Sequence, residues 1–212
     1  MNRYTLILTF LLSLFLLSGC DSGFMSETVD SDELIQRDGL YYKKYTDVPY
    51  TGKVTGQEQG LMRKGKREGE WVVYYDNGRL DRKGTYKNGQ EEGEWIEYWD
   101  NGQLQYKETY KNGKLEGEQV RYHSNGQLGE KGTWKNGEPE GEWVAYWANG
   151  NLSSKGTYKD GKDEGEVFVY YEYGQLRFKE TYKNGKKEGE SIHYHENGKL
   201  SSKGTYKDGK LE

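Results

Sequence analysis

Few residues in this chain could do chemistry, and most of those recur at a fixed spacing. A catalytic site is built from different residues that converge on one point. Here glutamates, lysines and tyrosines repeat every 24 residues, and no phosphate-binding loop, Cys-x-x-Cys or Ser-His-Asp pattern is present. We therefore predict that the chain has no catalytic site and is not an enzyme.

The three histidines, His123, His193 and His195, are the candidates for metal binding. His193 and His195 would share one face of a strand and could hold a metal weakly. His123 would lie six strands away, about 29 Å at roughly 4.8 Å per strand. A structural or surface role is the preferred interpretation, so we predict no metal site and no cofactor.

The only cysteine, Cys20, lies at the end of an apolar run. Arg3 precedes this run, which extends from Tyr4 to Leu17 and as a helix would be about 21 Å long, too short to cross a bilayer comfortably. Such a run is typical of a signal peptide. Leu17-Ser18-Gly19-Cys20 resembles the lipobox of bacterial lipoproteins, which implies that Cys20 is lipidated. A plain signal peptide with an incidental cysteine is the alternative.

These features predict how the first part of the chain is organised. Residues 1–19 are expected to be a lipoprotein signal peptide, and residues 20–38, which are polar and acidic, a flexible tether. The protein is then expected in the cell envelope, anchored by lipid to the inner or the outer membrane. Its net charge of -4 gives no electrostatic support for a nucleic-acid partner.

The rest of the chain is a repeat. Only 32% of the residues are hydrophobic, yet 20 Tyr, 6 Trp and 30 Gly recur at regular intervals. Glu-Gly-Glu begins at residues 68, 92, 116, 140, 164 and 188, so residues 68–211 form six units. Residues 39–67 are interpreted as a degenerate lead-in repeat. Such regularity with little apolar content is typical of a thin repeat structure.

Each unit contains two turn signals, such as Asn77-Gly78 and Asn88-Gly89. Asn-Gly favours the tight turn between antiparallel strands, and the segments between the turns are rich in Tyr, Trp, Val and Thr. The predicted fold is all-β: an elongated, single-layer antiparallel β-meander of stacked hairpins, which could also curl along its apolar face.

Two-residue turns would fix the strand register. Counting outward from Asn77-Gly78 pairs Trp71 with Gly84, Val73 with Arg82, and Tyr75 with Leu80. Counting from the second turn of each unit predicts five Lys–Glu pairs: Lys83/Glu94, Lys107/Glu118, Lys131/Glu142, Lys155/Glu166 and Lys179/Glu190. Opposite charges across a sheet stabilise it by roughly 0.2–1 kcal/mol each.

The same counting separates two faces. One is mixed and wettable and carries Glu94, Ile96, Tyr98, Lys107 and Thr109. The other is richer in aromatic residues. The predicted binding residues lie there: Trp71, Tyr75, Trp95, Trp99, Trp143, Trp147 and Tyr171. Two interpretations stay open, because these rings could be an exposed binding surface or the core of a curled sheet.

The segments "GEWVVYYDNGRL" and "KGTYKNGQEEGEW" resemble the MORN-repeat variant of bacterial YwqK-type antitoxin proteins. The resemblance covers about residues 39–212. It implies a β-hairpin array that binds proteins or membranes and has no catalysis of its own. Similar repeats accompany some eukaryotic phosphatidylinositol phosphate kinases, but no kinase region is present here, so that activity is not transferred.

Two functions of different classes follow. The first is a lipid-anchored scaffold for a protein partner, such as a toxin or an envelope protein, which would make it an antitoxin or immunity-type protein. The alternative is a cell-wall or glycan binder that uses an aromatic ladder. The position of Trp71 is occupied by Gln119, Val167 and Ser191 in other units, and this variation favours the protein partner. A plain structural spacer is the third interpretation.

Overall fold

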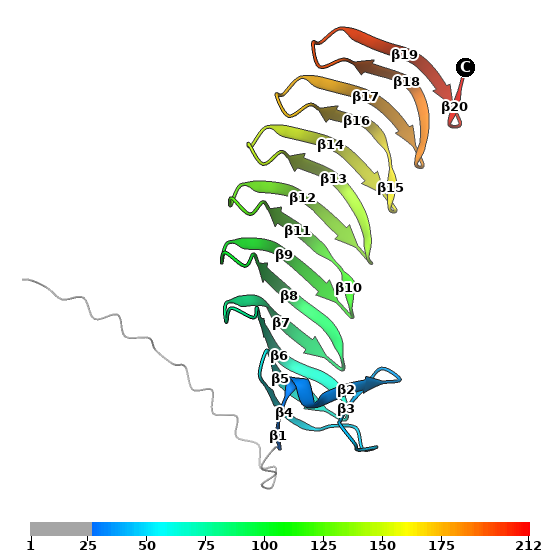
Figure 1. Ribbon diagram of the computed structural model, residues 1–212. Helices are drawn as coiled ribbons and strands as arrows, with labels where there is room; N and C mark the ends of the chain where they lie inside the picture. The colour runs from blue at the N-terminus through cyan, green and yellow to red at the C-terminus, as the bar shows by residue number, and fades with distance from the viewer. Residues whose placement is uncertain (1–26) are drawn as a thin grey trace, which may run out of the picture.

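The computed structural model describes residues 27–212. The predicted signal peptide and Cys20 lie outside these residues. Figure 1 shows hairpins that follow one another in chain order along one axis, and the sheet that they form does not close. In the described part of the chain, no helix has the length and apolar character needed to cross a membrane.

Twenty strands and one short 3-10 helix make up this part. The N-terminal elements are β1 (Thr28–Asp30), the 3-10 helix η1 (Ser31–Glu33), β2 (Leu34–Arg37), β3 (Leu40–Lys43), β4 (Gly52–Thr55) and β5 (Glu58–Arg63). Next come β6 (Lys66–Tyr74), β7 (Leu80–Lys87), β8 (Gln90–Tyr98), β9 (Leu104–Lys111), β10 (Lys114–Leu115), β11 (Gly117–Tyr122) and β12 (Leu128–Lys135). The last are β13 (Glu138–Tyr146), β14 (Leu152–Lys159), β15 (Lys162–Asp163), β16 (Gly165–Tyr170), β17 (Leu176–Lys183), β18 (Lys186–Tyr194), β19 (Leu200–Lys207) and β20 (Lys210–Leu211).

Eighteen of the strands form one sheet. From β4 onward the paired strands run antiparallel, which confirms the predicted antiparallel meander. The short strands β10 and β15 pair only with the strand before them, and β11 and β16 pair with β9 and β14. Two N-terminal features differ from it. Strand β1 pairs in parallel with β4, and β2 and β3 form a separate two-stranded sheet.

The predicted tether is wrong for residues 28–37, which form β1, η1 and β2. Val29 of β1 is buried with Val54 of β4 in the core cluster. Burial of these side chains, together with the β1–β4 hydrogen bonds, orders a segment whose polar composition favoured disorder.

The two turns of each unit are built differently. At Asn88-Gly89 both residues have positive φ, 53° and 80°, and Lys87 pairs with Gln90, as expected for a two-residue turn. At the other turn, only Gly78 has positive φ. Its N–H donates to the carbonyl of Tyr75 (2.8 Å), so this connection is a five-residue loop.

This loop changes one predicted pair and keeps two. Trp71 faces Gly84 and Val73 faces Arg82, as predicted. Leu80, however, faces Tyr74 rather than Tyr75, because a β-bulge shifts the register by one residue beside the loop.

The five predicted Lys–Glu pairs are wrong. Thr85 pairs with Glu92, but Lys83 pairs with Ile96, because Gly93 adopts a positive φ of 74° inside a bulge. The glycine of every Glu-Gly-Glu segment has positive φ. The partners of the five lysines are therefore Ile96, Val120, Val144, Phe168 and Ile192.

A Lys–Glu ladder exists nevertheless, within the other hairpin. Lys107 contacts Glu94 at 2.8 Å and Lys131 contacts Glu118 at 2.5 Å. Two equivalent pairs, Lys179–Glu166 and Lys203–Glu190, repeat the contact. These side chains are largely exposed to solvent, which screens their charges, so each pair adds little to the stability of the sheet.

The fully buried apolar core lies at the N-terminal end of the described residues. Its members are Val29, Tyr50, Val54, Met62, Trp71, Tyr86 and Trp95. Further along the array, most apolar side chains are only half-buried. Each later hairpin thus depends on contacts with its immediate neighbours.

Candidate interaction face

The indoles of three predicted binding residues lie over glycines of the preceding strand. Trp71 covers Gly60, Trp95 covers Gly84, and Trp143 covers Gly132, and a Cβ at each glycine would overlap the ring. The Nε1 of Trp71 donates to a backbone carbonyl at 3.1 Å. These glycines are therefore required by close ring-to-backbone packing.

Trp71 and Trp95 are core residues, with exposed fractions of 1% and 2%. Tyr86 lies between them, with ring centroids 6.1 Å and 4.9 Å away in edge-to-face geometry. Neither indole has free surface for a partner. Trp143 is half-buried, and its binding role stays a prediction.

Four other predicted binding residues belong to a hydrogen-bonded ladder beside the five-residue loops. The Nε1 of Trp99 donates to the carbonyl of Tyr122 at 3.1 Å, 23 residues further along the chain. The same bond recurs from Tyr75, Trp147 and Tyr171. His123 occupies the missing step and contacts the carbonyl of Tyr146 at 2.8 Å, which gives this histidine a structural role. All four predicted residues are half-buried, and their binding role remains a prediction.

Two carboxylates interrupt the glycine–ring packing. In two units the position of Gly84 is occupied by Glu108 and Glu180. In the same units the tryptophan of the next strand is replaced by Gln119 and Ser191. Gln119 hydrogen-bonds Glu108, and the Ser191 hydroxyl donates to Glu180 at 3.1 Å. The exchange thus replaces a ring on glycine with a hydrogen-bonded polar pair.

Glu180 is the most enclosed carboxylate of this face, with 3% of the residue exposed. Burial would raise the pKa of its carboxyl group. Hydrogen bonds from Lys187, Tyr182, His193 and Ser191 outweigh that effect and lower the pKa to about 2. His193, one of the candidate metal ligands, is held by this carboxylate and stacks on Phe178 at 5.2 Å.

One row of residues on the aromatic face varies, although the frame repeats. Each member pairs directly with the next across the sheet. We call it the variable row: Val73, Arg82, Glu97, Tyr106, Arg121, Glu130, Ala145, Ser154, Val169, Phe178, His193 and Ser202. Sequence reasoning missed this row. Aligning the 24-residue units would have found it, because these positions differ from unit to unit.

The adjacent row, which lies one residue before or after the variable row on alternate strands, faces the other side and is nearly constant. We call it the constant row: Val72, Lys83, Ile96, Lys107, Val120, Lys131, Val144, Lys155, Phe168, Lys179, Ile192 and Lys203. Lysine alternates there with a large apolar residue throughout. Variation is therefore confined to one face of these paired positions.

The variable row changes character along the array. Its first half carries charge: Arg82 lies 3.9 Å from both Glu91 and Glu97, and Arg121 lies 3.2 Å from Glu130. Burial raises the pKa of Glu97, which indicates a partly desolvated surface. From Ala145 to Phe178 the row is uncharged. A ligand along it would meet paired charges first and small or apolar groups next.

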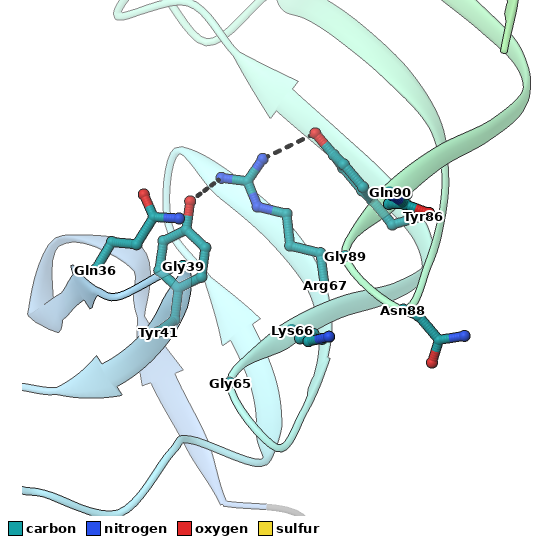
Figure 2. A pocket seen from close by; sticks show the side chains of 10 residues that line it. All are labelled: Gln36, Gly39, Tyr41, Gly65, Lys66, Arg67, Tyr86, Asn88, Gly89 and Gln90. Atoms are coloured by element: carbon teal, nitrogen blue, oxygen red, sulfur yellow. Dashed lines mark hydrogen bonds between the residues drawn. The ribbon is translucent and has the colours of Figure 1, made fainter. Parts of the chain in front are cut away.

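A separate pocket of about 460 Å³ lies where the β2–β3 sheet meets the first repeats. Figure 2 shows the Arg67 side chain between Tyr41 and Tyr86, with hydrogen bonds to both hydroxyl groups, at 3.3 Å and 3.1 Å. Glu58 also pairs with Arg67. The guanidinium is thus used to join the N-terminal elements to the array.

In the described part of the chain, no three His, Cys, Asp or Glu side chains are grouped closely enough to hold an ion. The two histidines predicted to share a strand face differ in their surroundings. His193 contacts Glu180, whereas His195 is the first residue of a five-residue loop.

The fold and the face define a class of protein: an open array of β-hairpins with a constant frame and one varying surface row. The model of the family described as "MORN repeat variant" matches residues 67–88, 91–112, 115–136, 139–160, 163–184 and 187–208, more than half of the chain. The chain belongs to this family of repeat scaffolds. The six matches confirm the predicted number and period of the units.

The other comparisons add little. A comparison with curated protein sequences finds no match. One solved structure that resembles part of the chain is titled "Crystal structure of GtfA/B complex bound to UDP and GlcNAc", at 12% identity and a TM-score of 0.17. The match covers 63% of this chain and 24% of that one. At that TM-score the likeness carries no argument.

Proposed function

We propose that this protein is a non-catalytic scaffold that binds a protein partner along the variable row. The observation that carries the proposal is the contrast between the two rows. Neighbouring positions on the same strands are constant on one face and varied on the other, which suits recognition of a partner with its own sequence of groups.

The two other interpretations lack this support. A glycan platform would use an exposed ladder of rings, whereas Trp71 and Trp95 are buried. A plain spacer needs a constant frame but has no use for a row in which Arg121, Ala145 and Val169 occupy equivalent places in successive units. A protein partner accounts for both the frame and the variation.

A pair of matched variants tests the proposal. Tyr106→Ala with Arg121→Ala removes two central members of the variable row, and Lys107→Ala with Lys131→Ala alters the constant row. We expect the first variant to weaken the affinity of a partner recovered by crosslinked pull-down from native membranes by about tenfold or more, since tyrosine and arginine are common hot-spot residues. The control should bind as wild type does. Equal losses in both variants, at equal melting temperatures, would contradict the proposal.

The location of the scaffold is part of the proposal. We propose that lipid on Cys20 anchors it in the cell envelope of a bacterium, where its partner would be an envelope protein or an exported toxin, as the resemblance to YwqK-type antitoxins suggests. Cys20→Ala should release the protein from the membrane fraction, because the multiple acyl chains typical of lipoproteins are what give firm anchoring. Retention of the variant in that fraction would contradict lipid anchorage.

A further inference from the structure

Almost every glycine of the ring-packing positions is covered by a bulky side chain. Gly60, Gly84 and Gly132 lie under indoles. Near the end of the array, a Cβ at Gly204 would lie 2.6 Å from the side chain of Leu211. The two units without this glycine fill the space with Glu108 and Glu180. The array therefore has a repeated site that is normally occupied from within.

Gly156 is the exception among the described units. The residue in the tryptophan position of the next strand is Val167, whose Cγ2 would lie 3.2 Å from a Cβ at Gly156, whereas an indole would overlap it. The glycine is kept, but the ring that requires it is missing. The structure has a pocket of about 90 Å³ at this place, lined by Trp143, Val144, Ala145, Ser154, Gly156, Tyr158 and Val167 and also by the charged residues Glu130, Lys155 and Asp163.

The walls of this pocket indicate what it would take. In the first units Tyr86 has an indole on each side. Tyr158 has only Trp143, at 6.0 Å and 83°, and lacks the second ring. Edge-to-face ring pairs stabilise packing beyond the area that they bury. An aromatic ring in the pocket would complete the arrangement seen around Tyr86.

The position of the pocket indicates where the ring would come from. Ala145 and Ser154, which line it, belong to the uncharged half of the variable row. We propose that this pocket receives an aromatic side chain of the protein partner, as an anchor for the segment bound along the row. The inference rests on the proposed function and names the kind of side chain that the uncharged half of the variable row would recognise.

The first test uses toluene, the side-chain analogue of phenylalanine, and the full-length chain. Toluene should produce saturable NMR shifts at the methyl groups of Val167 and Ala145. Val167→Trp should remove this binding and raise the melting temperature, because the chain then supplies its own ring, as Trp95 does at Gly84. Val120→Trp, in the constant row on the other face, should leave toluene binding intact. Absence of shifts, or shifts that persist in Val167→Trp, would overturn the inference.

The second test uses the partner recovered in the pull-down. Val167→Trp should weaken its affinity about tenfold or more, since a buried aromatic anchor commonly dominates an interface. If Tyr106→Ala with Arg121→Ala weakens binding but Val167→Trp does not, the pocket inference is wrong and the proposed function stands. If neither variant weakens binding, the proposed function itself is wrong. A photocrosslink from Ser154 to a second copy of this chain, or to the chain's own N-terminal segment, would also overturn the inference.

Discussion

At the scale of single residues, paired substitutions explain how a regular array tolerates irregular units. Glycine with tryptophan and glutamate with a polar residue are two ways of filling the same site. Tryptophan and glutamate cannot be combined at this site, because the indole needs the space that the glutamate side chain occupies. The two positions should therefore be energetically coupled.

A double-mutant cycle at Glu180 and Ser191 tests this coupling. Glu180→Gly leaves a cavity, and Ser191→Trp alone forces an indole against the carboxylate, so each should lower the free energy of unfolding. Together they recreate the pairing of Gly84 with Trp95, and the combined loss should be smaller than the sum by about 1 kcal/mol or more. Denaturant unfolding of the four proteins measures it. Simple additivity would contradict the account.

Glu180 also predicts a pH dependence. Its folded-state pKa, about 2, lies below the ordinary value of 4.5. Its ionised form therefore stabilises the fold above about pH 4.5, and this contribution is lost as the pH falls from there toward 2. Glu180→Gln should cost about 1–3 kcal/mol at pH 7.

The difference between wild type and Glu180→Gln should shrink when unfolding is measured near pH 2.5. Comparing the two proteins cancels the titration of the many other carboxylates. A difference that stays constant from pH 7 to pH 2.5 would show that the carboxylate charge is not what stabilises the site.

At the scale of elements, the repeat period and the Asn-Gly turns were sufficient to predict the hairpins, but not the register across every turn. Counting from Asn77-Gly78 gave the correct partner of Trp71. Counting from Asn88-Gly89 gave three correct pairs and failed beyond Thr85 and Glu92, where Gly93 opens a bulge. A glycine in a strand often marks a bulge, but not every such glycine does. The packing of Trp95 over Gly84 beside this bulge is a contact between strands, which the local sequence does not determine. Because the variable row is defined by pairing across these bulges, it could not be recognised without the correct register.

Engineered disulfides distinguish the two registers. Cysteines at Lys131 and Val144, which are direct partners, should crosslink readily, since paired Cα atoms lie about 4.5–5.5 Å apart. Cysteines at Lys131 and Glu142 are diagonal to each other and should crosslink poorly. Mass spectrometry of the oxidised proteins measures both. Preferential crosslinking of the second pair would restore the register expected from uniform two-residue turns.

At the scale of the whole molecule, the array separates stability from recognition. Buried apolar side chains gather at the N-terminal end, Arg67 joins the β2–β3 sheet to the repeats, and the ladder beside the loops ties each hairpin to the next. None of these contacts depends on which side chains occupy the variable row, although one member of that row, His193, also contacts the buried Glu180. That freedom allows one row to be adapted to a partner while the frame stays constant.

A photocrosslinking scan in native membranes tests this separation most directly. A photoreactive residue is placed at Arg82, Arg121, Ser154 or Phe178 in the variable row, and at Lys83, Val120, Lys155 or Ile192 in the constant row. The account predicts crosslinks to one partner protein from several positions of the variable row and none from the constant row. Crosslinks to that partner from the constant row, with the variable row silent, would contradict it.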